Sequence, residues 1–571
     1  MCCNGLDAVR EKENEKSNKN NLSTSFDIET FLVSKNKFTT IDFDTIVLKH
    51  KKKKELIKYS DNLFNEGKIF DSLHLSNYIV EKYPKDYYGY YNIGNCLMKI
   101  KKNNEALNYL NIAINISPAN ELLYLKKGIA LYNLQKYEEA IETFNKGLFL
   151  NDKIVDFYLN KGVVLNRIEK YKQALDTFDQ GLKLNPDDSN LYNNKGVSYF
   201  RLEDYKSSID MYDKSIELNH NDSFPLNNKG ISLKCLRRFK EALYCFEKAI
   251  QIDPKDPVSY CNKANCLREL GNYNEALNYY DKAIELKKNY SNAYYYKGVT
   301  YNYLGNYKEA INNFTECIEI NPKNEKAFLN RGISYDLLGN SEEAIENFNS
   351  ALSINEQYPE AYIYKGISYF KQNFFTEAIL CYKNAITIND EFALAYNNLG
   401  ICLFKIGEYD RALKAYSDAI AIDKYYLDAY INKGICLKEL NQDAYAIQEF
   451  DKAINLNKNF ALAYYNKAVV LSTFSDNDKK EEAIENYNKA ILNKEDYVNA
   501  YYNKGKVLLE LGRNNEALEC FKKVKELNKN KEEVFDIEGN VKNWESKISL
   551  NNNLISNDKE KEELLEIPQI N

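Results

Sequence analysis

Few of the residues that make catalytic or metal sites occur in this 571-residue chain. Its 3 histidines, His50, His74 and His220, lie far apart in sequence, and its 12 cysteines include no C-x-x-C pair. The sequence also has no H-E-x-x-H motif, no G-x-x-x-x-G-K-[ST] loop and no G-x-G-x-x-G motif after a strand. These patterns would indicate a zinc, nucleotide or dinucleotide site. We therefore expect no catalytic site, no metal and no cofactor, and we predict that the chain is not an enzyme.

Long apolar runs and a strong net charge are missing as well. No apolar stretch approaches the roughly 20 residues that span a bilayer, and the N-terminus has no apolar signal core. The formal net charge of −6 gives no general attraction to nucleic acid or to an anionic membrane. The sequence thus predicts a cytoplasmic protein that has neither nucleic acid nor membrane as its partner. Cys2 stands where myristoylation needs glycine, which excludes that modification, whereas palmitoylation of Cys2 or Cys3 stays open.

A 34-residue period runs through most of the chain. Glycine or alanine stands at position 94 and at every thirty-fourth residue up to Ala468, and then at Gly505. A second small residue follows twelve positions later in each repeat except one, where the interval from Ala468 to Ala483 is fifteen. Three residues are therefore inserted near 472–480, and we expect them to form a mobile loop that leaves later spacing intact. Self-similarity at a fixed period indicates a repeat architecture.

Each repeat has the pattern of two helices with a short break between them. In the repeat at 257–290, Tyr260 and Leu267 lie on one helical face, and Tyr280 lies on the face of a second helix. Gly271 is predicted to end the first helix. Such a hairpin leaves an apolar side uncovered, so it is stable only when neighbouring repeats stack on it. Four cysteines share one repeat position where other repeats have small residues such as Ala130, Ser198 or Thr300, which predicts small buried thiols in reduced form.

The repeats resemble the tetratricopeptide repeat (TPR) family. That family has a large residue at position 4, glycine at 8, an aromatic residue or leucine at 11, alanine at 20, an aromatic residue at 24 and alanine at 27. The repeat at 325–358 supplies these six residues as Phe328, Gly332, Tyr335, Ala344, Phe348 and Ala351. Position 7 departs from the family, since it is Lys or Arg in eleven of thirteen repeats. We expect the side-chain stem there to lie on the packing seam while the ammonium stays in water.

The resemblance implies an all-α, right-handed α-solenoid (a superhelix) of about 13–14 TPR helical hairpins with a C-terminal capping helix. Thirteen repeats run over residues 87–531, and a degenerate repeat precedes them at 53–86. Residues 532–549 are predicted to form the capping helix, because terminal repeats need a cap with a polar outer face. The N-terminal segment 1–45 is predicted to be mostly disordered and the tail 550–571 disordered.

Asparagine recurs at position 6 of the first helix, two residues before the periodic glycine. Ten of thirteen repeats have it, whereas positions 2 and 5 have three asparagines each, so a general abundance of asparagine does not explain the pattern. Positions 2, 6, 9 and 13 share a face that is separate from the packing seam. In the TPR family this face lines the concave groove. The ten residues are Asn92, Asn160, Asn194, Asn228, Asn262, Asn330, Asn398, Asn432, Asn466 and Asn503.

A side-chain amide offers one carbonyl acceptor and two N–H donors, which match the N–H and C=O of a peptide bond. The ladder of amides resembles that in the TPR superhelix of O-linked N-acetylglucosamine transferase, where asparagines at this position hold the substrate backbone. This resemblance implies that the ten asparagines bind extended peptide segments of other proteins. A purely structural role for them is the alternative. The carboxylate clamp of chaperone-binding TPR proteins is incomplete here, since Tyr91 and Cys261 stand where it needs lysine.

The predicted function is therefore that of a non-catalytic adaptor or scaffold, which holds extended segments of partner proteins in the concave groove. Two alternatives stay open. One is a structural subunit of a larger multiprotein assembly, as TPR proteins are in ubiquitin ligases and ciliary transport particles. The other is a substrate-docking arm for a separate enzyme. The sequence predicts no particular oligomeric state.

Overall fold

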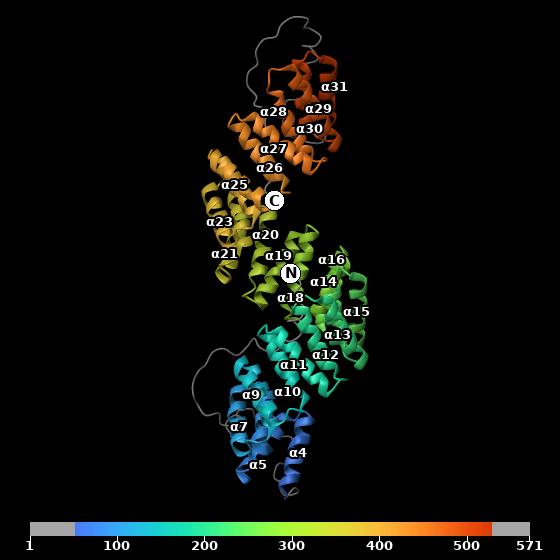
Figure 1. Cartoon of the computed structure of the whole chain (residues 1–571), viewed down its shortest axis with the longest axis vertical. Coiled ribbons are helices and arrows are strands. Elements are labelled where there is room, and N and C mark those ends of the chain that lie inside the picture. Colours follow the sequence, from blue (N-terminus) through green and yellow to red (C-terminus); the bar gives the residue numbers. More distant parts are fainter. Residues whose placement is uncertain (1–51, 528–571) are drawn as a thin grey trace. The chain divides into compact units, whose positions relative to one another are not determined.

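The computed structural model describes residues 52–527, and every regular element in that range is an α-helix. Twenty-eight helices, α4 to α31, follow one another there without a strand (Figure 1). The prediction of an all-α solenoid of helical hairpins is confirmed. The predicted capping helix at 532–549, the segment 1–45 and the tail 550–571 lie outside the described residues.

The chain divides into two compact bodies, which are called the N-terminal body (described residues 52–296) and the C-terminal body (described residues 297–527). The division falls within α18 (Ser291–Tyr303). The helices before α18 are α4 (Lys53–Asn65), α5 (Ile69–Lys82), α6 (Tyr87–Lys99), α7 (Asn103–Ile116), α8 (Glu121–Asn133), α9 (Tyr137–Leu150), α10 (Val155–Arg167), α11 (Tyr171–Leu184), α12 (Ser189–Arg201), α13 (Tyr205–Leu218), α14 (Ser223–Cys235), α15 (Phe239–Ile252), α16 (Pro257–Glu269) and α17 (Tyr273–Leu286).

The C-terminal body continues the same alternation of thirteen-residue and fourteen-residue helices with one exception, at α28 and α29. Its helices are α19 (Tyr307–Ile320), α20 (Glu325–Leu337), α21 (Ser341–Ile354), α22 (Pro359–Lys371), α23 (Phe375–Ile388), α24 (Ala393–Lys405), α25 (Tyr409–Ile422), α26 (Leu427–Glu439), α27 (Asp443–Leu456), α28 (Ala461–Ser472), α29 (Asn477–Asn493), α30 (Val498–Glu510) and α31 (Asn514–Leu527).

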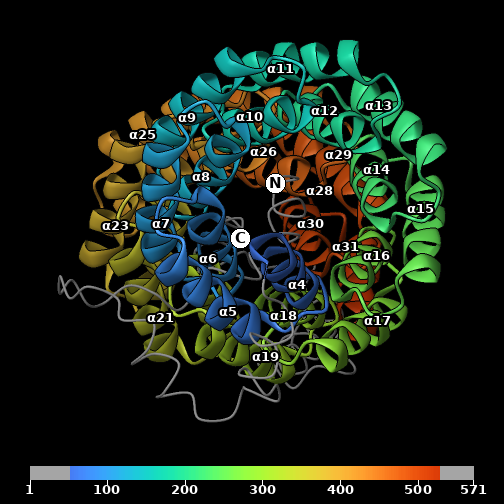
Figure 2. The same cartoon turned by 90° about the horizontal axis from the view of Figure 1, so that it is seen from below.

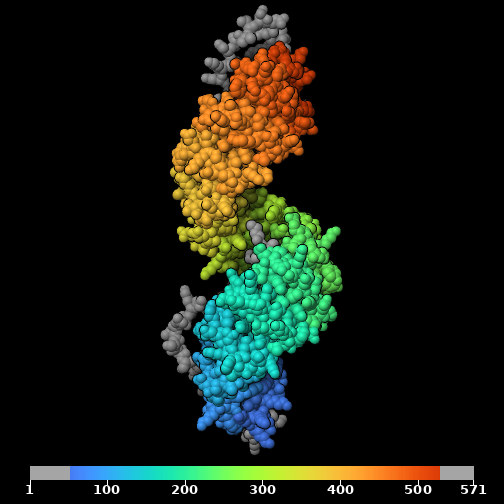
Figure 3. Space-filling model, viewed as in Figure 1, coloured from blue at the N-terminus to red at the C-terminus, as the bar shows by residue number. Residues whose placement is uncertain are grey.

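The two helices of a repeat pack on each other, and the second also packs on the first helix of the next repeat. In the N-terminal body the first helices α8, α10, α12 and α14 lie on the inner side of the curved stack, and α9, α11, α13 and α15 lie outside them (Figure 2). Side chains fill the space between neighbouring helices (Figure 3). The periodic glycine allows this close packing, because a Cβ at Gly128 would lie 2.2 Å from Cε1 of Phe144.

The turn between the two helices of a repeat places one residue in the left-handed region. Gly271 has φ 80°, as expected for a residue that ends a helix, and glycine stands at the same position in five other repeats, the degenerate one included. Other repeats carry a side chain there, and Gln135 has φ 62°. The turn geometry therefore belongs to the repeat and does not depend on glycine.

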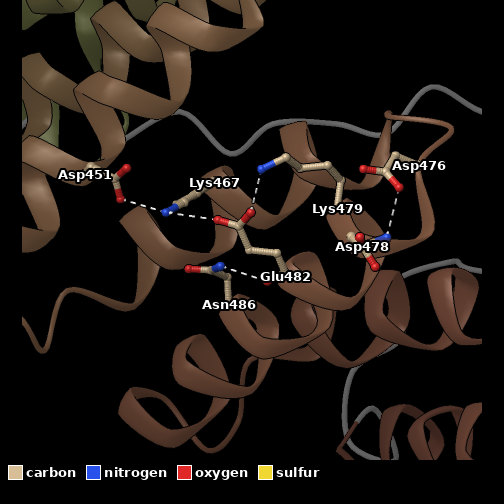
Figure 4. Close-up of polar contacts among 7 residues, drawn as sticks. All are labelled: Asp451, Lys467, Asp476, Asp478, Lys479, Glu482 and Asn486. Atoms are coloured by element: carbon tan, nitrogen blue, oxygen red, sulfur yellow. Dashed lines mark hydrogen bonds and ion pairs between the residues drawn. The ribbon is translucent and has the colours of Figure 1, made fainter.

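The insertion near 472–480 does not form the mobile loop that the spacing predicted. Helix α28 ends at Ser472, and α29 begins at Asn477 and has 17 residues, whereas the second helices of the other repeats have 14. The carboxylate of Asp476 accepts a hydrogen bond from the N–H of Asp478, and the ammonium of Lys479 lies 2.8 Å from Glu482 (Figure 4). Three residues make almost one helical turn, so the insertion lengthens the helix instead.

The basic residue at position 7 is an ion-pairing group in several repeats. Lys263 Nζ lies 2.9 Å from Glu247 Oε1, and Lys467 Nζ lies 2.8 Å from Asp451 Oδ1. In each pair the acid stands sixteen residues earlier, at position 25 of the preceding repeat. The Lys263 side chain is only 8% exposed, so the expectation that this ammonium stays in water is wrong. The pair joins neighbouring repeats at a seam where the family has an apolar contact.

Candidate functional site

All ten predicted asparagines lie on first helices of their repeats. Three of them are half-buried, namely Asn160 on α10, Asn194 on α12 and Asn330 on α20. The other seven are buried, and Asn398 is only 1% exposed. The 34-residue period thus brings the asparagines to one row of helices, but it does not give them equal surroundings.

Several of the buried asparagines connect neighbouring repeats. Asn228 Nδ2 donates to Asn193 Oδ1 at 3.1 Å, and Asn262 Nδ2 donates to Asn227 Oδ1 at 3.1 Å. The same contact joins Asn432 Nδ2 and Asn397 Oδ1 at 3.0 Å, and Asn503 Nδ2 donates to the hydroxyl of Tyr465 at 3.0 Å. Each bond joins position 6 of one repeat to position 5 of the repeat before it. These amides therefore hold the repeats in register.

The first asparagine of the ladder is held by a carboxylate. Asn92 Nδ2 donates to Asp61 Oδ1 at 2.9 Å, and the Tyr88 hydroxyl donates to Asp61 Oδ2 at 3.0 Å. Burial, together with the hydrogen bond and the negative charge of Asp61, raises the pKa of the Tyr88 phenol. Tyr88 therefore stays protonated and keeps donating to the carboxylate. This end of the inner face is a closed polar network that joins α4 to α6.

The half-buried asparagines bond back to their own helices. Asn160 Nδ2 donates to the backbone carbonyl of Asp156 at 2.8 Å, and Asn194 Nδ2 donates to that of Asn190 at 2.8 Å. Among the described residues nothing donates to the side-chain carbonyl of either asparagine. Helices α10 and α12 are neighbouring first helices in contact with each other. Two adjacent repeats thus present an amide acceptor on the inner side of the N-terminal body.

Some buried amide atoms have no partner. Neither Oδ1 nor Nδ2 of Asn398 makes a hydrogen bond, and Oδ1 of Asn228 and Oδ1 of Asn432 are also unpaired. An unpaired buried group costs about 1–3 kcal/mol. Close to Asn432, burial raises the pKa of the Asp428 carboxyl and raises the pKa of Tyr426 to about 12. The inner face of α24 and α26 is therefore a poorly solvated polar surface.

The described range also contains cysteine thiols and other side chains of the types that bind metal ions. No group of three or more His, Cys, Asp or Glu residues there could hold a metal ion. Its ten cysteines are all free thiols, and burial raises the pKa of Cys245 and of Cys381 to about 11. Thiols with such a pKa are protonated near neutral pH and are poor nucleophiles. None of the helices from α4 to α31 has the length and apolar character needed to cross a membrane.

Stacked hairpins of nearly constant length that bury their apolar sides on one another define a helical-repeat solenoid. The chain belongs to the tetratricopeptide repeat family. Models of this repeat match residues 87–120, 123–153, 155–188, 189–222, 224–256, 256–323, 313–346, 366–407, 393–426, 427–460, 476–512 and 498–531. The resemblance predicted from the sequence is thereby confirmed for the family and for its fold.

Among solved structures, the APC/C hetero-tetramer Cut9–Hcn1 is 13% identical, with a TM-score of 0.42 over 80% of this chain and 96% of that one. Yeast Tom70 is 18% identical, with a TM-score of 0.37 over 78% of this chain and 97% of that one. YrrB, described as a TPR protein with an unusual peptide-binding site, is 26% identical, with a TM-score of 0.27, and covers 33% of this chain and 96% of its own. No curated protein matches the sequence. These similarities assign no partner to the chain.

Proposed function

We propose that the chain is a non-catalytic scaffold that holds extended segments of partner proteins on the inner side of the N-terminal body, and that it works in the cytoplasm. The TPR solenoid is a fold typical of protein interaction scaffolds. The observation that carries the proposal is the pair Asn160 and Asn194. Both are half-buried on neighbouring first helices, and the carbonyl of each has no partner among the described residues.

The spacing of these amides suits an extended backbone. Packed helices lie about 8–10 Å apart, and an extended chain rises about 3.3 Å per residue. Successive amides therefore meet a bound strand at roughly every third residue. Each Oδ1 accepts from a backbone N–H of the ligand, which requires no particular ligand side chain. Partners are thus recognised first by an extended conformation.

The side chains around the two asparagines set a broad preference. Leu122, on the preceding first helix, is 47% exposed, and Lys126 stands at position 6 of that repeat in place of asparagine. Asp156 and Asn190 are exposed at position 2 of the two repeats. This mixture favours ligands that combine apolar and charged residues. Of the ten asparagines predicted from the sequence, the proposal rests on Asn160 and Asn194, because several of the others connect repeats.

The test compares two double variants on 15-residue unstructured peptides selected from a display library against the full chain. In Asn160→Ala with Asn194→Ala we expect a loss of about 1 kcal/mol per amide, or roughly thirtyfold in Kd. The melting temperature should be kept, because alanine favours the helix. In the control, Asn228→Ala with Asn262→Ala, two bonds between repeats are lost and the melting temperature should fall. If the first variant binds normally, the chain acts through another surface, as an assembly subunit or a docking arm would.

A further inference from the structure

Position 29, near the end of the second helix, shows two exceptions to a polar pattern. Ten of the thirteen repeats carry a polar or charged residue there and one carries Ala421. The other two carry Phe149, which is 91% exposed, and Leu492, which is 79% exposed. Scattered exposed apolar residues are ordinary on protein surfaces. These two stand out because no other repeat has a large apolar residue at this position, and because the residues around them also match.

The two exceptions share one surface pattern, which we call the second-helix stripe. Residues 142–149 and residues 485–492 both read Glu-x-x-Asn-Lys-x-x-apolar, and both repeats have tyrosine at position 4. The spacing i, i+3, i+4 and i+7 places the four residues on one helical face. On α9 the stripe lines an open hollow of about 480 Å³ together with Tyr124 and Leu150. The pattern occurs once in each body, on α9 and on α29.

Both stripes have asparagine at position 25, where five of the other eleven repeats have an acid. Position 25 is Asp179, Glu247 or Asp451 in repeats whose neighbour forms the ion pair, but it is Asn145 on α9 and Asn488 on α29. The lysines that follow sixteen residues later are Lys161 and Lys504, and neither forms an ion pair among the described residues.

Lys146 is the one base of the stripe on α9, and burial together with the charge of Lys146 lowers the pKa of Lys127 on α8. By analogy with Lys195, which pairs with Asp179 sixteen residues before it, we infer that Lys161 faces Asn145. Burial lowers the pKa of the Lys161 ammonium, so a carboxylate brought to it would stabilise its charged form. Glu142 is the one acid of the stripe. At the second stripe, Glu485 is the acid of the stripe, and Glu516, whose pKa is lowered mainly by Arg513 and also by Lys504, is bonded to Arg513 at 2.6 Å.

We propose that the two stripes are copies of one docking surface for a partner segment that carries carboxylates beside a large apolar side chain. The apolar side chain packs on Phe149 or Leu492, and the carboxylates take the place of the missing acid at Lys161 or Lys504. Charge complementarity selects this occupant. The stripes lie on the second helices α9 and α29, whereas Lys161 and Lys504 lie on the first helices that follow, at position 7 and next to the asparagines of position 6. The proposal does not depend on the function proposed for those asparagines.

The experiment uses the full chain and three fluorescein-labelled twelve-residue peptides. One alternates Asp and Glu with Phe and Leu, the second replaces the acids by Asn and Gln, and the third replaces the apolar residues by Ala. We expect the first peptide to bind and the other two to bind at least about tenfold more weakly, a difference of about 1.4 kcal/mol, since each of them lacks either the carboxylates or the apolar side chains. Binding of the first should also weaken as salt rises.

The variants distinguish binding at the two stripes from a general effect of charge on peptide binding. Phe149→Glu with Leu492→Glu should lower the affinity for the first peptide about tenfold or more without a fall in melting temperature, because both side chains are exposed. Lys161→Gln with Lys504→Gln should reduce its salt dependence. Thr387→Glu, at position 29 of another repeat, adds the same charge elsewhere and should bind normally. The proposal is overturned if the first two peptides bind equally well, or if the variant at Phe149 and Leu492 binds as the wild type does. It is also overturned if the wild type binds none of the peptides. A dimer that Phe149→Glu dissociates would also overturn it, because a second copy would then be the occupant.

Discussion

The repeats differ in whether the aromatic residue at position 24 carries a hydroxyl group. Its ring fills the space that the glycine at position 8 leaves, and most repeats use Phe, as at Phe144. Tyr280 and Tyr382 carry a hydroxyl in the same place. The Tyr280 hydroxyl donates to Asn265 Oδ1 at 2.7 Å, whereas the Tyr382 hydroxyl is buried without a partner. The Tyr280 hydroxyl is expected to stabilise the N-terminal body, and the Tyr382 hydroxyl is expected to destabilise the C-terminal body.

We therefore predict opposite effects on stability for the same substitution, Tyr to Phe, at these two positions. Tyr382→Phe removes an unpaired buried hydroxyl and should raise the free energy of unfolding of the C-terminal body by about 1 kcal/mol. Tyr280→Phe removes the hydroxyl that donates to Asn265 Oδ1 and should lower the free energy of unfolding of the N-terminal body by about 1–2 kcal/mol. Hydrogen exchange of α22–α25 and of α16–α17 measures the two changes separately. A change of the same sign in both bodies would show that hydroxyl pairing does not decide the effect.

At the residue scale, the sequence predicted the packing glycines but not the polar contacts. A glycine every 34 residues has a direct steric cause, which is the ring at position 24. The bonds between Asn228 and Asn193, and between Lys263 and Glu247, depend on which side chains of neighbouring repeats come together. The signal for the second contact was present as an acid sixteen residues before the lysine. The sequence alone does not show which residues contact position 7, so it does not distinguish the acid at this spacing from other acids nearby.

At the scale of the element, α29 shows why spacing alone does not decide between a loop and a longer helix. The extra residues include Asp476, whose carboxylate caps the helix, and Lys479, which pairs with Glu482. Lys480 Nζ also lies 2.6 Å from Glu510 Oε2 on α30. A period that lengthens by three residues is compatible with either structure. The local cap and the ion pairs favour the helix.

The cap of α29 can be tested by a single substitution. Asp476→Ala should lower the stability of the α28–α29 hairpin by about 1 kcal/mol, the usual cost of losing an N-cap. Asp478→Ala is the control, because it loses only the interaction of an acid with the first turn, worth about 0.3–1 kcal/mol. Hydrogen exchange of the amides in the first turn of α29 gives the measurement. Equal protection in the wild type and in Asp476→Ala would mean that the carboxylate does not hold this turn.

For the whole molecule, contacts between neighbouring helices dominate, since each helix packs mainly on those before and after it. Unfolding should therefore be less cooperative than in a globular protein of this length. The repeat period predicted this property. It did not predict a division into two bodies, because the same helical pattern continues across residues 296 and 297.

Gly230→Leu tests how far a local defect spreads. A Cβ at this position would lie 2.6 Å from Cε1 of Phe246, so a leucine overpacks the seam between α14 and α15 at a cost of roughly 1–3 kcal/mol. We expect faster hydrogen exchange in α12–α17, while α20–α31 of the C-terminal body keep their protection, because the strain acts through contacts between neighbours. Gly271→Ala is the matched control: its site has no atom within 4 Å, and its positive φ strains only the turn. A uniform loss of protection along residues 52–527 would show that the repeats unfold as one cooperative unit.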